Sequence, residues 1–134
     1  MKKILIAVAA FYLTGCASDD MLNNKFPTIV TKPAENLAGV WTGALGPYIS
    51  TLKINSDGSG YSCYSWNDKK SVDRIKFDGA NIYFQEGTRL QILSKNSAIL
   101  KVNAPYGFGK EYTYTRDDNL NQASPYCVKE IKEL

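Results

Sequence analysis

The chain has 134 residues with 16 Lys and Arg, 13 Asp and Glu and no His, and 44% of its residues are apolar. This length fits one domain, and the apolar and aromatic content is typical of a chain with a packed core. Without histidine, neither Ser-His-Asp nor Cys-His catalytic arrangements can form, and histidine metal sites are excluded. We therefore expect a protein that is not an enzyme and that holds no metal or other cofactor.

An export signal is predicted at the N-terminus. Two lysines at residues 2–3 precede an apolar run at residues 4–13, which is too short for a bilayer because a spanning helix needs about 20 apolar residues. The run ends in Leu13-Thr14-Gly15-Cys16, with small residues before a cysteine whose thiol is the only nucleophile there able to accept a lipid. These four residues resemble the lipobox of bacterial lipoproteins, which implies cleavage between Gly15 and Cys16 and lipidation of Cys16. An ordinary secretory signal with a chance cysteine is the alternative.

Processing at this site changes the charge of the chain and attaches it to a membrane. Loss of residues 1–15 removes two of the 16 basic residues and leaves 14 against 13 acidic ones, a net charge of about +1. No clustered basic face is visible, so no nucleic-acid partner is expected. The membrane becomes a partner through the lipid on Cys16, since two or three acyl chains anchor a protein stably. Ala17 and Ser18 follow without an aspartate, which resembles the outer-membrane address of enterobacteria-like lipoproteins, and we expect the domain to face the periplasm.

Residues 16–36 are expected to form the lipidated cysteine and a flexible tether, between a signal peptide at 1–15 and a β-barrel domain at 37–134. The tether is rich in Asp, Asn and Pro and shows no sustained hydrophobic period. A few of its apolar residues are candidates for docking on the domain: Phe26, Ile29 and Val30.

Cys63 and Cys127 remain for a disulfide once Cys16 is lipidated. Two cysteines in an exported protein are more often bonded than free. Two unrelated reduced thiols are the alternative, and a redox-active pair is less expected because the Cys-x-x-Cys spacing is absent. The sequence therefore predicts a disulfide between Cys63 and Cys127.

Short strands separated by turn residues are predicted along the rest of the chain. Asp57-Gly58-Ser59-Gly60 is expected to be a turn, since a calcium loop counted from Asn55 would place Trp66 where the bidentate Glu belongs. The predicted strands are 39–43, 48–55, 61–66, 72–77, 80–85, 88–93, 97–103 and 110–116. Residues 128–134 are left open between a last strand and a short helix. Strands at this spacing favour an all-β fold: a single antiparallel up-and-down meander of about eight strands, closed into a small barrel that leaves no exposed edge.

The first predicted strand begins with Gly39-Val40-Trp41. A Gly-x-Trp at this place, followed by short meandering strands, resembles the calycin superfamily, which includes the lipocalins. The resemblance covers about residues 37–116. It implies a calycin-like barrel in which Trp41 closes one end against a late-chain arginine, for which Arg116 is the candidate.

Two further groups of residues are candidate sites. Tyr106-Gly107-Phe108 lacks the helix and the Lys-Ser/Thr that follow a phosphate-binding loop, and we predict an aromatic contact loop for a partner. Asp117, Asp118 and Glu111 lie near a strand end, and nothing in the sequence places one of them in an apolar pocket as a glycosidase requires. They are expected to be solvated charges.

Three functions remain open, in the order in which the sequence favours them. The first is a non-catalytic cell-envelope lipoprotein, a membrane-tethered domain that binds an envelope protein or another envelope component. The second is a periplasmic lysozyme inhibitor, because the membrane-bound lysozyme inhibitor family also has a lipobox, about eight strands and a disulfide to the chain's end. Residues 112–117 and Cys127 are similar in kind to its last strand and final cysteine, but residues 56–61 lie too early for its inhibitory loop.

The third function is a carrier of a small apolar ligand, for which the barrel leaves little room.

Overall fold

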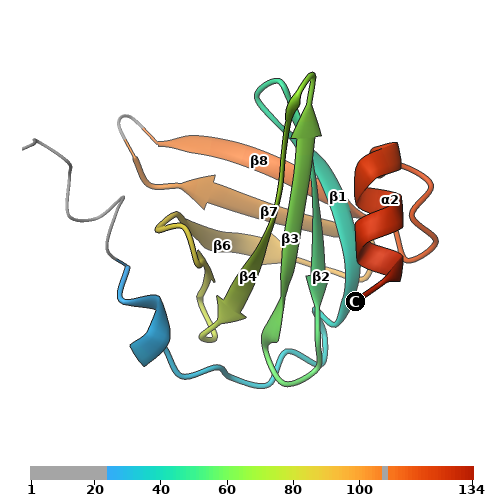
Figure 1. Cartoon of the computed structure of the whole chain (residues 1–134). Coiled ribbons are helices and arrows are strands. Elements are labelled where there is room, and N and C mark those ends of the chain that lie inside the picture. Colours follow the sequence, from blue (N-terminus) through green and yellow to red (C-terminus); the bar gives the residue numbers. More distant parts are fainter. Residues whose placement is uncertain (1–23, 107–108) are drawn as a thin grey trace, which may run out of the picture.

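Eight antiparallel strands close into one barrel (Figure 1). The computed structural model describes residues 24–106 and 109–134. Each strand pairs with the next along the chain, and the last pairs with the first, so Trp41 lies opposite Arg116. The elements are η1 (Phe26–Thr28), β1 (Gly39–Leu45), β2 (Tyr48–Ile54), β3 (Ser59–Trp66), β4 (Lys69–Phe77), β5 (Asn81–Phe84), β6 (Arg89–Lys95), β7 (Ile99–Ala104), β8 (Lys110–Arg116) and α2 (Pro125–Lys132).

The predicted all-β barrel is confirmed, with differences at the ends of some strands. The expected turn at residues 57–60 is shorter, because Gly60 already pairs with Ile54 on β2. The open choice at the C-terminus is settled as a helix that begins before residue 128. Its start is fixed by Ser124, whose hydroxyl oxygen accepts a hydrogen bond from the amide of Cys127 at 3.3 Å, and by Pro125 in the first turn.

Alternation along the strands fills the barrel with apolar side chains. On β2, for example, Ser50, Leu52 and Ile54 point inward and are buried. The largest side chains that are almost completely buried inside the barrel are Trp41, Leu52, Ile82, Leu90, Leu100, Val102 and Tyr114. Burial of each aliphatic side chain contributes about 1.5–3 kcal/mol. The interior is therefore a packed core over most of its length.

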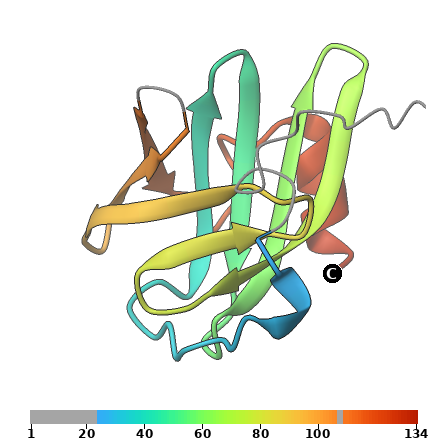
Figure 2. The same ribbon diagram turned by 90° about the vertical axis from the view of Figure 1, so that its left-hand side faces the viewer.

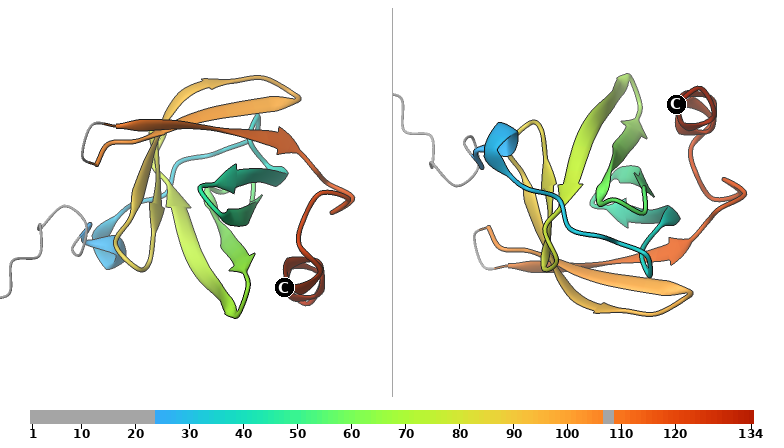
Figure 3. Two further views of the ribbon diagram at one scale, coloured as in Figure 1. Left: turned by 90° about the horizontal axis from the view of Figure 1, so that it is seen from above. Right: turned by 90° about the horizontal axis from the view of Figure 1, so that it is seen from below.

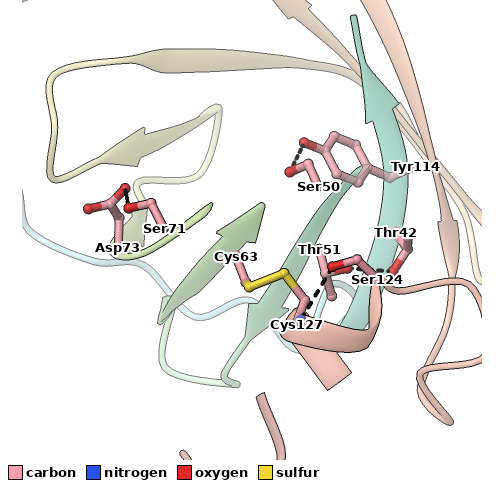
Figure 4. Close-up of a disulfide and its surroundings, with 9 residues drawn as sticks. All are labelled: Thr42, Ser50, Thr51, Cys63, Ser71, Asp73, Tyr114, Ser124 and Cys127. Carbon is pink, nitrogen blue, oxygen red and sulfur yellow. Dashed lines mark hydrogen bonds between the residues drawn. A yellow bond between two sulfur atoms is a disulfide. The ribbon is translucent and has the colours of Figure 1, made fainter. Parts of the chain in front are cut away.

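α2 lies outside the barrel, against β3 (Figure 1). Its Cys127 forms a disulfide with Cys63 on the outer face of β3, as the sequence predicts (Figure 4). Both cysteines are fully buried, in a second small core that also contains Leu120 and Ile131. The disulfide thus joins the chain's end to a strand near its middle. Among the described residues, no helix is long and apolar enough to cross a membrane.

Residues 24–38 form a strap that runs across the lower end of the barrel, as Figure 2 and the view from below in Figure 3 show. The amide of Lys32 donates to the carbonyl of Phe77 at 2.9 Å, and the amide of Ala34 donates to that of Ser56 at 2.8 Å. Ala34 and Leu37 are buried in the main core. Side chains of the strap therefore plug this end of the barrel.

The strap begins higher on the barrel wall, at residues that the sequence assigns to a flexible tether. The side-chain amide of Asn24 donates to the carbonyls of Phe84 at 2.7 Å and Thr88 at 3.2 Å. Of the apolar candidates for docking, Phe26 and Ile29 are half-buried, whereas Val30 is 75% exposed. The chain is thus in contact with the barrel from Asn24 onwards, because its polar groups find partners at strand ends.

We expect Cys63→Ala to lower the free energy of unfolding by roughly 2–5 kcal/mol, the usual cost of removing a native disulfide. Cys127→Ala should cost the same, and the double variant no more than either single one, because all three remove one bond. Chemical denaturation measures these values. Two reactive thiols in the oxidised protein, besides any at Cys16, would contradict the assignment.

Candidate functional site

The closed end of the barrel is built around Trp41. Its indole is fully buried, and the ring N–H donates to the carbonyl of Leu37 in the strap at 2.9 Å. The guanidinium carbon of Arg116 lies 4.3 Å from the centre of the ring, in cation–π contact. The structure therefore brings together the two residues that the resemblance to calycins pairs.

Arg116 also ties together the segments that meet at this end. Its guanidinium donates to the carbonyl of Ala38, and its Nε donates to that of Ser97 at 3.3 Å. A carboxylate oxygen of Asp118 lies 3.8 Å from Nη1. Gly39 has a φ of +136°, and a Cβ there would overlap the guanidinium of Arg116. The glycine of Gly-x-Trp is thus required by the arginine that covers the tryptophan.

Asp117 does not lie in solvent, contrary to the sequence prediction. It is 5% exposed, and its carboxylate accepts hydrogen bonds from the hydroxyl of Thr42 and from the amide of Asn121, both at 2.8 Å. These bonds fix the turn that leads from β8 towards α2. The neighbouring carboxylates Asp118 and Glu111 are exposed, as expected.

A cavity of about 410 Å³ opens at the opposite end of the barrel. We call this cavity the cup. Its walls come from inward-facing residues of β1 to β6 and from the β5–β6 loop: Leu45, Tyr48, Ser50, Ser62, Tyr64, Ser71, Asp73, Phe84, Glu86, Thr88 and Leu90. Because the core below it is packed, the cup occupies only the upper part of the barrel.

The base of the cup is fixed by a buried hydrogen bond between the hydroxyl groups of Ser50 and Tyr114, at 2.9 Å (Figure 4). Tyr114 is fully buried, and burial raises the pKa of its hydroxyl well above the ordinary value of a tyrosine. The hydroxyl therefore stays neutral in ordinary buffers. It acts as a hydrogen-bonding partner, not as a charge.

Aromatic side chains form one side of the cup's rim. The ring of Tyr48 contacts that of Tyr64 edge-on with 5.0 Å between centroids, and that of Trp66 with 5.9 Å. Trp66 is 45% exposed at the end of β3. We call these three residues the aromatic rim. It supplies flat apolar surface with polar edges, of a kind that is enriched in protein interfaces.

The charge of the cup is purely acidic. Its described lining contains Asp73 and Glu86 but no Lys or Arg. Asp73 accepts a hydrogen bond from the hydroxyl of Ser71 at 3.3 Å, and Glu86 accepts one from the amide of Thr88 at 3.1 Å. Over residues 24–106 and 109–134, neither carboxylate has a basic nitrogen within ion-pair distance.

The sequence prediction missed Asp73, although a signal for it was present. Ile75 and Phe77 are the buried residues of β4, and a period of two from them places Asp73 and Ser71 on the inner face. A carboxylate on the same face of a strand as core residues indicates that this part of the strand lines a polar cavity.

The predicted contact loop is only partly described. Tyr106 is half-buried, and its hydroxyl oxygen accepts a hydrogen bond from the amide of Arg89 at 2.7 Å. Gly107 and Phe108 lie outside the described residues, and so do Gly15 and Cys16 of the predicted lipidation site. Over the residues that are described, no cluster of three or more acidic or cysteine side chains could hold a metal ion.

Residues 23–131 match the model of a protein family described as the bacterial lipocalin LPS transport optimiser YedD. The chain belongs to this family. It is also similar to the crystal structure of a lipoprotein YedD from Klebsiella pneumoniae subsp. pneumoniae MGH 78578, with 18% sequence identity and a TM-score of 0.53. The match covers 81% of this chain and 92% of that one, and at this identity it shows the fold alone. No curated protein matches the chain.

Membership in the YedD family confirms that the chain is a bacterial lipoprotein with a calycin-like barrel. The family also supports the broad expectation of a non-catalytic envelope protein. It leaves the partner and the membrane face to be proposed from the site.

We expect Trp41→Ala to lower the free energy of unfolding by about 3–5 kcal/mol, because it leaves a large cavity at the closed end. Trp41→Phe should cost less, since a ring still fills the site. Arg116→Ala should remove the same cation–π contact. The loss of stability in the Trp41→Ala/Arg116→Ala double variant should therefore be smaller than the sum of the two single losses. Chemical denaturation of the four proteins measures this coupling. A loss below about 1 kcal/mol for Trp41→Ala would show that this tryptophan does not close the barrel.

Proposed function

We propose that the chain is a non-catalytic lipoprotein of the cell envelope that supports lipopolysaccharide transport by binding a protein partner at the open end of its barrel. The printed description of its family supports the process. The open end supports the mode of action, since it combines an aromatic rim with a polar cup. Trp and Tyr are enriched among the residues that dominate binding energy in protein interfaces.

The size and charge of the cup argue against lipopolysaccharide itself as cargo. Its volume of about 410 Å³ is near the lower end of the range of about 300–1,000 Å³ for small-molecule pockets. Lipopolysaccharide carries several acyl chains and phosphate groups. The acyl chains exceed the space in the cup, and the phosphates would be repelled by Asp73 and Glu86. A protein that acts on the transport machinery fits these observations better than a carrier.

The position of Asn24 supports a location of the open end close to the membrane. Asn24 is bonded to Phe84 and Thr88, which both line the cup. Eight residues lead from Cys16 to Asn24, so this stretch spans at most about 29 Å even when extended. A lipid on Cys16 would therefore hold the cup near the membrane surface. We propose the periplasmic face of the outer membrane, in line with the residues after Cys16.

The other functions considered from the sequence have less support. Residues 56–61, the nearest counterpart of a lysozyme-inhibiting loop, lie at the closed end. There the carbonyl of Gly58 accepts a hydrogen bond from the amide of Phe77 at 2.8 Å, and the carbonyl of Lys32 lies against Gly58. A segment held in this way does not project into an enzyme cleft. The acidic lining of the cup is equally unsuited to a purely apolar ligand.

Cells that lack the chain should deliver less lipopolysaccharide to their surface when transport is made limiting. The wild-type chain should restore delivery, whereas a Tyr48→Ala/Trp66→Ala variant should not, because it removes the aromatic rim. A Cys16→Ser variant should also fail, since it cannot be anchored. Surface lipopolysaccharide per cell is the measurement, at equal protein levels and after confirming that the rim variant unfolds at a normal temperature.

Leu134→Ala provides the matched control. Leu134 is 47% exposed, close to the 45% of Trp66, but it lies away from the open end (Figure 1). Its carbonyl accepts a hydrogen bond from Lys53 at 3.0 Å, next to β1. This variant should restore delivery fully. Full restoration by the rim variant, or normal delivery without the chain, would overturn the proposal.

A further inference from the structure

We propose that the cup is a receptor for one cationic side chain, an arginine in the first place, which the protein partner inserts into the open end of the barrel. The inference rests on the proposed function in one respect, that the occupant belongs to a protein. It adds the chemistry of recognition, and it names Asp73 as the charge that selects the occupant.

The first argument is the position of Asp73 on the wall of the cup. It faces inward from β4, opposite the buried Ser62 of β3, and it is half-buried. Its described polar contact within the barrel is the hydroxyl of Ser71, which donates at 3.3 Å (Figure 4). A carboxylate oxygen has room for more than one donor. Asp73 thus presents acceptor capacity and negative charge to whatever enters the cup.

The second argument is that nothing in the described lining offsets this charge. The lining contains two carboxylates and no basic residue. A fatty acid or a phosphate would place its negative charge beside Asp73 and Glu86, where like charges repel. A cation in the same place gains charge-assisted hydrogen bonds, which are among the strongest in proteins.

The third argument is the shape of the entrance. The entrance is flanked on one side by the aromatic rim, in which Tyr48 and Tyr64 contact each other edge to face. Leu45, Phe84 and Leu90 line the same cavity and suit an aliphatic stem. A guanidinium group combines a flat face that stacks on aromatic rings with a fork of donors that matches a carboxylate, whereas an ammonium group offers only a compact charge. Arginine therefore fits this cup better than lysine.

A lipid amine is a poorer occupant on the same grounds. In phosphatidylethanolamine the ammonium group lies next to a phosphate, which would come close to Glu86 at the rim of the cup. Its two acyl chains also need more apolar surface than the lining offers. The charge pattern thus favours a protein side chain.

The test uses the mature lipidated chain in nanodiscs of phosphatidylcholine and two small probes. N-acetyl-arginine-N-methylamide carries the guanidinium group, and its citrulline counterpart has nearly the same shape without the charge. Amide chemical shifts in the protein's NMR spectrum should move around Ser71, Asp73 and Tyr64 as the arginine probe is added. The citrulline probe should bind at least about tenfold more weakly, because its neutral urea group donates weaker hydrogen bonds to a carboxylate than a charged guanidinium does.

Variants then assign the effect to the carboxylate. Asp73→Asn keeps the shape and removes the charge, and should weaken arginine binding about tenfold. Glu86→Gln at the rim should weaken it less. Asp68→Asn is the matched control, since Asp68 lies exposed in the turn after β3 and does not line the cup. It should leave binding within about twofold.

Several outcomes would overturn the inference. Equal binding of the two probes, an unchanged affinity in Asp73→Asn, or shifts that map outside the cup would each do so. Tighter binding of decanoate than of the arginine probe would identify an apolar ligand instead. Shifts at the cup on changing the nanodisc lipid to phosphatidylethanolamine, without any probe, would identify a lipid amine. These binding results are independent of lipopolysaccharide delivery in cells, so either proposal can fail while the other stands.

Discussion

The contact between Arg116 and Trp41 is the interaction on which the rest of this barrel depends. It lies where the last strand meets the first, so it closes the sheet, and it covers the ring that fills the lower end. The same arginine holds the carbonyl of Ala38 in the strap, and the tryptophan holds that of Leu37. One pair of side chains therefore joins the last strand to the first and fixes the strap that precedes β1.

Closure of one end leaves the other end as the surface at which we propose that the partner binds. The core from Trp41 up to the Ser50–Tyr114 hydrogen bond is packed, which leaves a shallow cup in place of the deep interior expected of a lipid carrier. The disulfide supports this division in another way, because it holds α2 on the outer wall without entering the barrel. A rigid scaffold with one open, polar and aromatic end is well suited to binding a partner.

Much of this architecture could be predicted from the sequence, because it depends on local patterns. The alternation in β2, the turn residues between strands and the pair of remaining cysteines each carry a direct signal, and the Gly-x-Trp resemblance supplies Trp41 and Arg116. The strap could be predicted only in part: Phe26 and Ile29 stand out as apolar residues able to dock, but backbone amides and carbonyls also hold the strap, as at Lys32, and these groups leave no trace in residue type. The burial of Asp117 could not be predicted for a related reason: it depends on amides that come together only once the chain turns after β8.

The cup shows a different limit of sequence analysis. The inward phase of β4 is readable from Ile75 and Phe77, so Asp73 could have been placed on the inner face. Asp73 lines an open cavity only because the core does not fill the barrel to this height. The height of the core depends on packing among six strands. The described lining also contains no basic residue, and this could not be predicted because the lining residues come together only in the folded barrel.

The central claim, one closed end and one open end, can be tested with the two tryptophans of the chain, because one lies at each end. Acrylamide quenching of fluorescence in Trp66→Phe reports on Trp41 alone, and in Trp41→Phe on Trp66 alone. The structure predicts blue-shifted emission with almost no quenching for Trp41, and red-shifted, readily quenched emission for Trp66, which is 45% exposed. Equal quenching of the two tryptophans would contradict it.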